Sequence, residues 1–299
     1  MKIAVLGATG MLGSQVLKTL EEGHSHQLTA TNRNGHVVHS SSGSSTKIVD
    51  LDAGSIDARS IVDLIGDCDW WINCIGVIKP YIHDDNPIEI ARAIAINSLF
   101  PAILTQAADD SKSRLIQIST DCVWDGADGR YSELDHHNAA DVYGKSKSLG
   151  EVRSNYSHII RCSIIGRELR GKASLLDWFL SQEQSATLQG FSNHHWNGIT
   201  TLQFAKICKG IIEQNVTLKP LQHLVPRDQV SKHELLNLFA QYFRRQDITM
   251  TPFATEVPIN RTISTVDQGH NEKLWLCGDY PCPPSIEESI AELASDQAT

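Results

Sequence analysis

Paired cysteines are missing from this sequence. Its seven cysteines are an odd number, and no two of them stand in a CxxC spacing. Metal sites and redox motifs use that spacing, and disulfide frameworks use even numbers. We therefore expect free thiols in a reducing cytoplasm, and we assign no residue to a metal site.

Long apolar runs and an excess of basic residues are also missing. No run of 18 or more apolar residues occurs, so no membrane span is expected. The short apolar start leads directly into a glycine turn, which is typical of a buried strand rather than a signal peptide. The 26 Lys and Arg against 35 Asp and Glu give a net charge of −9, which argues against binding to nucleic acid. A cluster of backbone amides and arginine can still bind an anionic small molecule.

Strands and helices alternate through the first half of the 299 residues. Alternation of this kind predicts the α/β class with a doubly wound parallel sheet of the Rossmann type. The continuous apolar run Ile3–Leu6 suits a strand that is covered on both faces. The expected strands are Lys2–Leu6, Gln27–Thr31, Lys47–Val49, Trp70–Cys74, Leu115–Ser119 and His158–Arg161, and the expected helices are Met11–Glu22, Ser55–Ile65, Ile88–Asp109 and Tyr143–Asn155.

The regular alternation ends after Cys162. We predict a Rossmann domain over residues 1–162 and a smaller lobe over 163–299, above the carboxyl ends of the strands, where open α/β sheets bind their ligands. A return strand is expected near 223–225, a fraying acidic helix after Ile286, and an exposed serine-rich loop over 39–46. Helices are expected over Leu175–Leu180, Leu202–Ile212 and Ser231–Arg244.

A glycine-rich segment, GATGMLG (7–13), lies between the first strand and the first helix. Gly7 permits a tight turn, Gly10 lets the backbone approach a pyrophosphate, and Gly13 allows close packing of the helix. The helix start then offers amides and positive potential to phosphates. We predict dinucleotide binding here, through Thr9, Met11 and Leu12 as well as the glycines.

The end of the second strand indicates which dinucleotide is bound. An NAD enzyme usually has an acidic residue there for the ribose hydroxyls. No Asp or Glu lies between Glu22 and Asp50, and the strand is followed by Asn32 and Arg33. Arg33 can pair with a 2′-phosphate, so NADP(H) is the predicted cofactor.

Tyr143 and Lys147 are four residues apart, so on a helix they share one face. A neighbouring ammonium is expected to lower the pKa of the Tyr143 phenol, which then transfers a proton to or from a substrate oxygen. Thr120 follows the fifth strand and can hydrogen-bond the same oxygen. These three residues are the predicted catalytic set.

The combined motifs resemble the extended short-chain dehydrogenase/reductases, and within them the dTDP-4-dehydrorhamnose reductase-like branch. The resemblance covers about the first 160 residues in order, and shorter pieces beyond. The pieces are GATGMLG (7–13), Asp50-Leu51, NCIG (73–76), IN with FPA (96–102), STDCVWDG (119–126), YGKSKSLGE (143–151), WNGITT (196–201) and INRTIST (259–265).

This resemblance implies an NADP-dependent oxidoreductase acting on a CH–OH group: a reductase of a keto-sugar nucleotide in deoxysugar or cell-surface polysaccharide synthesis. It is compatible with a cytoplasmic homodimer. Asp50 and Leu51 would lie against the adenine. Cys74, Ile75 and Gly76 would line the cofactor groove, Asn73 would close its turn, and Asn97 would steady the helix that carries Lys147.

One departure from related enzymes leaves an alternative open. Nucleotide-sugar dehydratases resemble this chain but have an Asp-Glu pair where Asp121 and Cys122 stand, so dehydration is disfavoured. Epimerase-reductases have a cysteine at that position, and Cys122 with His194 or His195 could move a proton next to a carbonyl. A third reading is a non-catalytic, cofactor-binding regulatory subunit similar to that of methionine adenosyltransferase.

The substrate side is less sharply predicted. Arginine suits a diphosphate and tryptophan suits a base or sugar face. Trp178 is expected in the core, and Arg161 at a strand end. The candidate substrate contacts are Lys79, Asp121, Cys122, Trp196 and Arg261, with Arg161, Arg167, Trp178, His194 and His195 as further candidates.

Overall fold

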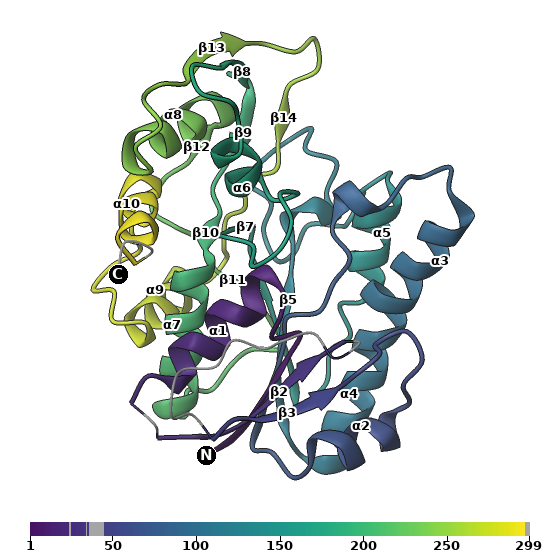
Figure 1. Ribbon diagram of the computed structural model, residues 1–299. Helices are drawn as coiled ribbons and strands as arrows, with labels where there is room; N and C mark the ends of the chain where they lie inside the picture. Colours follow the sequence, from purple (N-terminus) through teal and green to yellow (C-terminus); the bar gives the residue numbers. More distant parts are fainter. Residues whose placement is uncertain (24, 34, 36–44, 297–299) are drawn as a thin grey trace.

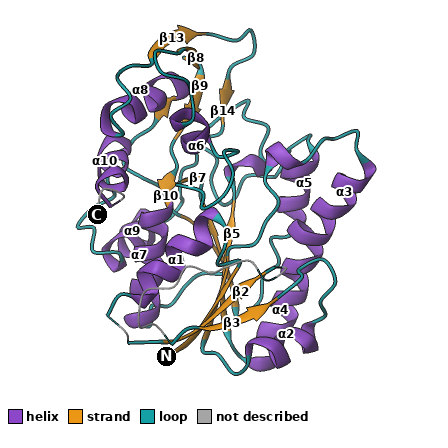
Figure 2. Ribbon diagram, viewed as in Figure 1, coloured by secondary structure: helices purple, strands orange, loops and turns teal. Residues whose placement is uncertain are grey.

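A computed structural model describes residues 1–23, 25–33, 35 and 45–296. Most of the serine-rich segment 39–46 lies outside these residues. A seven-stranded parallel sheet with the order β11-β6-β5-β4-β1-β2-β3 forms the centre of the molecule (Figures 1 and 2). The Rossmann-type prediction is therefore confirmed. The strands are β1 (Lys2–Leu6), β2 (Gln27–Asn32), β3 (Lys47–Asp50), β4 (Trp70–Asn73), β5 (Arg114–Ser119), β6 (Ser157–Arg161) and β11 (Leu221–His223).

The alternation of side chains in β1 separates two apolar layers. Ile3 and Val5 join a core with the helices on one face, and Ala4 and Leu6 join a core on the other. Burial on both faces explains why the strand is apolar without interruption. The first face is covered by α1 (Met11–Glu21), α7 (Thr201–Glu213) and α9 (Gln268–Cys277), and the second by α2 (Ala58–Ile65), α3 (Pro87–Ile94), α4 (Phe100–Ser111) and α5 (Val142–Leu149) (Figure 1).

Residues after Cys162 contribute to both parts of the molecule. The return strand exists as β11 and pairs with β6, two residues earlier than predicted. Helices α7 and α9 cover the sheet, whereas the other late elements form a lobe beyond it (Figure 1). The division at residue 162 stays a prediction. The lobe contains α6 (Leu175–Leu180), α8 (Lys232–Tyr242), α10 (Ile286–Asp296) and the short strands β7 (Ile164–Ile165), β8 (Thr187–Phe191), β9 (His194–Trp196), β10 (Ile199–Thr200), β12 (Val230–Ser231), β13 (Thr249–Phe253) and β14 (Ile259–Asn260).

The acidic C-terminal helix does not fray, contrary to the sequence prediction. Ile286, Ile290 and Leu293 of α10 are fully buried in the core of the lobe. Their spacing of four and three residues places them on one helix face. Glu287 and Glu288 are exposed, and Glu292 pairs with Lys206. The helix is therefore amphipathic, which its acidic composition did not indicate.

The predicted helix over Ile88–Asp109 exists, but its middle is π-helical rather than α-helical. It runs from Pro87 to Ser111 with a π-helical stretch at Ala95–Leu99. Pro101 has no N–H to donate to the carbonyl of Asn97, four residues earlier, which accounts for the π-helical stretch. Gly150 packs against this carbonyl, and a Cβ atom on Gly150 would lie 2.0 Å from the Asn97 oxygen. Helix α5 ends at Leu149, six residues before the predicted end.

This helix also bears on the expectation that no segment spans a membrane. The helix has 25 residues, and an 18-residue stretch within it has a mean hydropathy of 1.4, so by length and composition alone it could cross a membrane. In the structure it is part of the sheet-covering layer, and Phe100, Leu104 and Ala107 are fully buried in the core. Core helices meet the same two criteria.

Candidate active site

The loop between β1 and α1 is shaped by two glycines. Gly7 has a φ of +84°, and its amide donates to Thr31 Oγ1 at 2.9 Å. A Cβ atom on Gly13 would lie 2.1 Å from the Gly7 carbonyl oxygen, so only glycine lets α1 pack this closely on the loop. The turn and packing roles predicted for these two glycines are therefore present in the structure.

The start of α1 is uncapped. Its N-cap residue, Gly10, offers no side chain, and no acidic residue lies in the first turn. By contrast, α2, α3, α5, α6, α7, α8 and α9 each begin at a side chain that accepts from a backbone amide. Free amides and an uncompensated positive helix end fit the pyrophosphate of a dinucleotide. Thr9, Gly10, Met11 and Leu12 line a cavity of about 800 Å³ at this point.

The ends of β2 and β3 lie side by side. Asn32 pairs with Asp50 in the parallel ladder, and the Leu51 amide donates to the Asn32 carbonyl at 2.9 Å. Leu51 is buried, while Arg33 is exposed directly beyond β2. The structure thus gathers Asn32, Arg33, Asp50 and Leu51 at one edge of the sheet, next to the strand that precedes the glycine loop.

The segment after β4 forms another wall of the cavity. Cys74, Ile75 and Gly76 line it. Asn73 accepts from the Ile75 amide at 3.0 Å and so closes the turn. Asn97 lies behind the wall: its amide group bonds both backbone groups of Val77 and donates to Ser146 of α5. Asn97 therefore ties this wall to the helix of Lys147 and is not itself part of the cavity lining.

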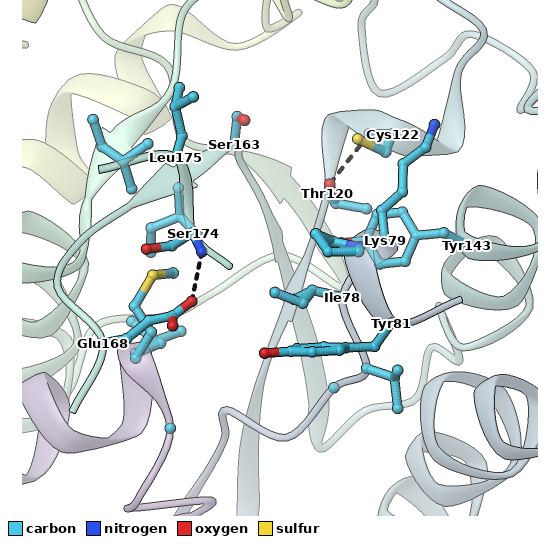
Figure 3. Close-up of a pocket in the computed structure, with 18 of the residues that line it drawn as sticks. Ile78, Lys79, Tyr81, Thr120, Cys122, Tyr143, Ser163, Glu168, Ser174 and Leu175 are labelled. Atoms are coloured by element: carbon cyan, nitrogen blue, oxygen red, sulfur yellow. Dashed lines mark hydrogen bonds between the residues drawn. The ribbon is translucent and has the colours of Figure 1, made fainter. Parts of the chain in front are cut away.

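Thr120, Tyr143 and Lys147 all line the cavity. Figure 3 shows the first two of these side chains. The Thr120 hydroxyl donates to Asp121 Oδ1 at 3.0 Å and accepts from the Cys122 amide at 3.2 Å. The Lys147 ammonium donates to the Ile118 carbonyl at 3.3 Å. Helix α5 packs closely on the turn that follows β5. The contact is at Gly144, where a Cβ atom would lie 2.3 Å from the Cys122 carbonyl oxygen. The predicted catalytic set is thus gathered in one place.

Burial is the largest cause of the pKa shifts of Tyr143 and Lys147. It raises the pKa of the Tyr143 phenol, and the Thr120 side chain only partly opposes this. Burial also lowers the pKa of Lys147, against the attraction of Glu151. The sequence prediction of a lowered Tyr143 pKa is therefore wrong for the protein alone. A protonated phenol is the form that can donate to a substrate oxygen.

Cys122 has the wrong electrostatic surroundings for a base. Its Sγ lies 3.7 Å from an Asp121 carboxylate oxygen. Burial, followed by repulsion from Asp121, raises the pKa of the thiol to about 12. His194 lines the same cavity, but its Nε2 lies 2.9 Å from the Thr255 hydroxyl. At neutral pH the thiol is therefore protonated, and a thiolate is disfavoured.

The substrate-side candidates separate into two groups. Lys79, Asp121, Cys122, Trp196, His194 and Trp178 line the cavity. Arg261 instead donates to the Trp124 carbonyl, and Arg167 pairs with Asp177. Arg161 is fully buried in an ion pair with Glu151, so its candidacy as a substrate contact is wrong. Trp178 is 38% exposed, and its predicted place in the core is also wrong.

Sequence reasoning missed Lys232, which also lines the cavity. Its ammonium lies 5.3 Å from the centre of the Trp196 ring. Ser231 and Glu234 form a capping box that marks the start of α8, so the position of Lys232 in the helix could have been predicted. Its direction could not, because it depends on how the lobe packs against the sheet. Figure 3 shows the two walls, with Thr120 and Tyr143 on one side and Glu168, Ser174 and Leu175 on the other.

The chain is similar to known proteins in sequence and in fold. The chain is 35% identical over 153 residues to the "Probable low-salt glycan biosynthesis reductase Agl14" of Haloferax volcanii, a match that covers 49% of this chain and 46% of that protein. It is 23% identical over 302 residues to the methionine adenosyltransferase 2 subunit beta of Xenopus tropicalis, covering 96% and 86%. The chain thus spans about half of the first relative and most of the second.

A solved structure extends the likeness to the whole chain. The dTDP-4-dehydrorhamnose reductase of Bacillus anthracis in complex with NADP has a TM-score of 0.73 and 19% identity, over 99% of each chain. At this identity the likeness concerns the fold. The family model described as the RmlD substrate binding domain matches residues 1–263. The chain therefore belongs to the RmlD substrate binding domain family.

Proposed function

We propose that this chain is an NADPH-dependent reductase of a keto-sugar nucleotide. The observation that carries the proposal is the grouping of Thr120, Tyr143 and Lys147 in one cavity with the uncapped start of α1. A reductase in low-salt glycan biosynthesis among its relatives supports this reaction type, and an NADP complex among its structural neighbours supports the cofactor. Glycan or deoxysugar synthesis in the cytoplasm is the setting we infer.

The cofactor would lie along the edge of the sheet. The amides at the start of α1 would hold the pyrophosphate, and Arg33 would pair with the 2′-phosphate. Cys74, Ile75 and Gly76 would line the groove toward the nicotinamide. Bound NADPH supplies a hydride to the carbonyl carbon of the substrate.

The protein's own groups complete the reduction. Thr120 would orient the carbonyl oxygen by a hydrogen bond, and Tyr143 would give its phenolic proton to that oxygen, so that the product is an alcohol. Burial keeps Tyr143 protonated until this step. Lys147 would hold the nicotinamide ribose and stabilise the phenolate that remains.

A non-catalytic role is the second candidate, because the match to methionine adenosyltransferase 2 subunit beta covers 96% of the chain. Measuring turnover distinguishes the reductase from the non-catalytic subunit. Purified protein is incubated with NADPH and each of several 4-keto nucleotide sugars, and both cofactor oxidation and the alcohol product are measured. We expect stoichiometric product with at least one sugar, formed far more slowly by Tyr143→Phe. Tight NADPH binding without turnover of any sugar would favour the regulatory role.

A further inference from the structure

A buried ion pair lies directly behind the catalytic set. The side chains of Glu151 and Arg161 are 4% and 1% exposed, and neither lines the 800 Å³ cavity. A buried charge pair is costly to desolvate and is retained only where its geometry is well satisfied. No part of the proposed reaction uses it directly, so the presence of two buried charges here calls for another explanation.

The Arg161 guanidinium makes hydrogen-bonding contacts with three side chains. It donates from Nε to Glu151 Oε1 at 2.9 Å and from Nη2 to Glu151 Oε2 at 2.5 Å. Nη1 and Nη2 also contact the Nε2 atoms of His223 at 2.5 Å and His137 at 2.8 Å. The Trp124 ring packs on the guanidinium at 4.7 Å.

These contacts fix the state of both histidines. A guanidinium can only donate, so each Nε2 must accept and each ring must be neutral, with its proton on Nδ1. His223 Nδ1 then donates to the Ser264 carbonyl at 2.6 Å, and His137 Nδ1 to the Ser148 hydroxyl at 2.7 Å. The carboxylate of Glu151 is thus held from one side by a guanidinium that also bonds to two histidines.

From the other side, Glu151 reaches the catalytic elements. The Ser119 hydroxyl donates to Glu151 Oε1 at 2.5 Å, and Ser119 directly precedes Thr120 at the end of β5. Glu151 also follows Lys147 by four residues, just beyond the end of α5, and both residues line one small cavity together with Ser119. Attraction to the Glu151 carboxylate opposes the effect of burial on the pKa of Lys147. One carboxylate therefore connects the strand end that carries Thr120 with the helix that carries Lys147.

We propose that Glu151 is a positioning residue, which keeps the Lys147 ammonium charged in its buried site and fixes the end of β5 that carries Thr120. This role rests on the proposed reductase function. The groups that act on Lys147 are Glu151 and the Cys162 thiol, whose pKa is raised by burial so that it is uncharged near neutral pH. Glu151 itself faces Arg161, His137 and the Ser119 hydroxyl. Its carboxylate is therefore the anion that offsets burial of the Lys147 ammonium.

The test separates this role from a purely structural one. Glu151→Gln alone leaves Arg161 buried without its counterion, so we expect it to be destabilised. The double variant Glu151→Gln/Arg161→Gln removes both charges and keeps hydrogen-bonding groups, so its thermal stability should recover toward that of the wild type. If Glu151 acts only through stability, the double variant should also recover its function.

The readout that needs no substrate is the titration of Lys147. Lysines are reductively methylated with ¹³C-formaldehyde, and the Lys147 signal is assigned by its loss in Lys147→Arg. In the double variant we expect its midpoint to fall by about one pH unit, because a neighbouring opposite charge is gone. Asp247→Asn, which breaks the Arg245–Asp247 pair outside the cavity lining, should leave it unchanged. An unchanged midpoint in the folded double variant overturns the proposal.

Turnover then tests the link to the reaction. With an accepted keto-sugar nucleotide, the pH above which kcat declines should move down by the same amount in the double variant. Ser119→Ala, which keeps the ion pair, should lower kcat roughly tenfold with little change in KM, because Thr120 is less well placed. Wild-type kcat in Ser119→Ala overturns the part of the proposal that concerns β5. A shifted Lys147 titration without turnover of any sugar would refute the reductase function and retain the electrostatic role of Glu151.

Discussion

Gly144 packs so closely on Cys122 that a Cβ atom at residue 144 would lie 2.3 Å from the Cys122 carbonyl oxygen. This approach holds α5, with Tyr143 and Lys147, against the turn that follows Thr120. The same atom would lie 2.4 Å from the Ala139 side chain, so there is no room for a larger residue on either side. The identity of one small residue thus determines how the two halves of the catalytic set meet.

We expect Gly144→Ala to destabilise the protein by about 1–3 kcal/mol, the cost of overpacking, and to lower turnover more than cofactor binding. Denaturant unfolding and kcat measure the two effects. Gly269→Ala is a matched control, because Gly269 is an exposed helical glycine whose Cβ would have only one neighbour, 3.7 Å away. That change should be neutral or stabilising by up to about 1 kcal/mol. Equal behaviour of the two variants would contradict the packing argument.

The order of the elements was more predictable than the direction of particular side chains. The alternation of apolar strands with helices and the glycine loop predicted the sheet and the position of the site, because both depend on local sequence. The burial of Arg161, the exposure of Trp178 and the placement of Lys232 were not predictable. Each depends on which distant segment packs against it, and the sequence around each residue carries no sign of that partner.

The second prediction concerns the cofactor. Arg33 is exposed at the end of β2, where no acidic residue follows in the strand. Arg33→Ala should weaken NADPH binding by about 1–3 kcal/mol, the scale of a charge-assisted hydrogen bond, and leave NADH binding nearly unchanged. Titration calorimetry with both cofactors measures this. Arg59→Ala removes an exposed charge on α2 and should change neither affinity; equal wild-type affinities for NADPH and NADH would defeat the assignment.

The third prediction concerns Tyr143. Tyr143→Phe keeps the ring and loses the proton donor, so fold and NADPH affinity should persist while kcat falls by roughly 10²–10⁴-fold. Circular dichroism, NADPH titration and kcat on the accepted sugar measure the three quantities. Full activity in Tyr143→Phe would show that another group protonates the substrate.

The fourth prediction concerns acid stability. Burial and the Arg161 charge lower the pKa of His223 to about 4, below the usual value near 6.5. The unfolded chain therefore binds a proton in this interval that the folded protein does not, so stability should fall as the pH drops from about 6.5 to 4. His223→Gln can still accept from Arg161 and donate to Ser264, and it should reduce this slope. An identical slope in denaturant unfolding at several pH values would remove His223 as its cause.

The last prediction separates reduction from epimerisation at Cys122. A reductase needs one proton donor and one hydride, whereas an epimerase must also remove a proton from carbon. Cys122 is poorly suited to that removal, because burial and Asp121 raise the pKa of its thiol to about 12. The enzyme is incubated with a keto-sugar nucleotide in D₂O without NADPH, and deuterium at the carbon next to the carbonyl is measured by mass spectrometry. We expect no incorporation above the background without enzyme. The reading changes to an epimerase if incorporation depends on the enzyme and disappears in Cys122→Ser, since only a carbon–hydrogen bond broken at that thiol would give both results.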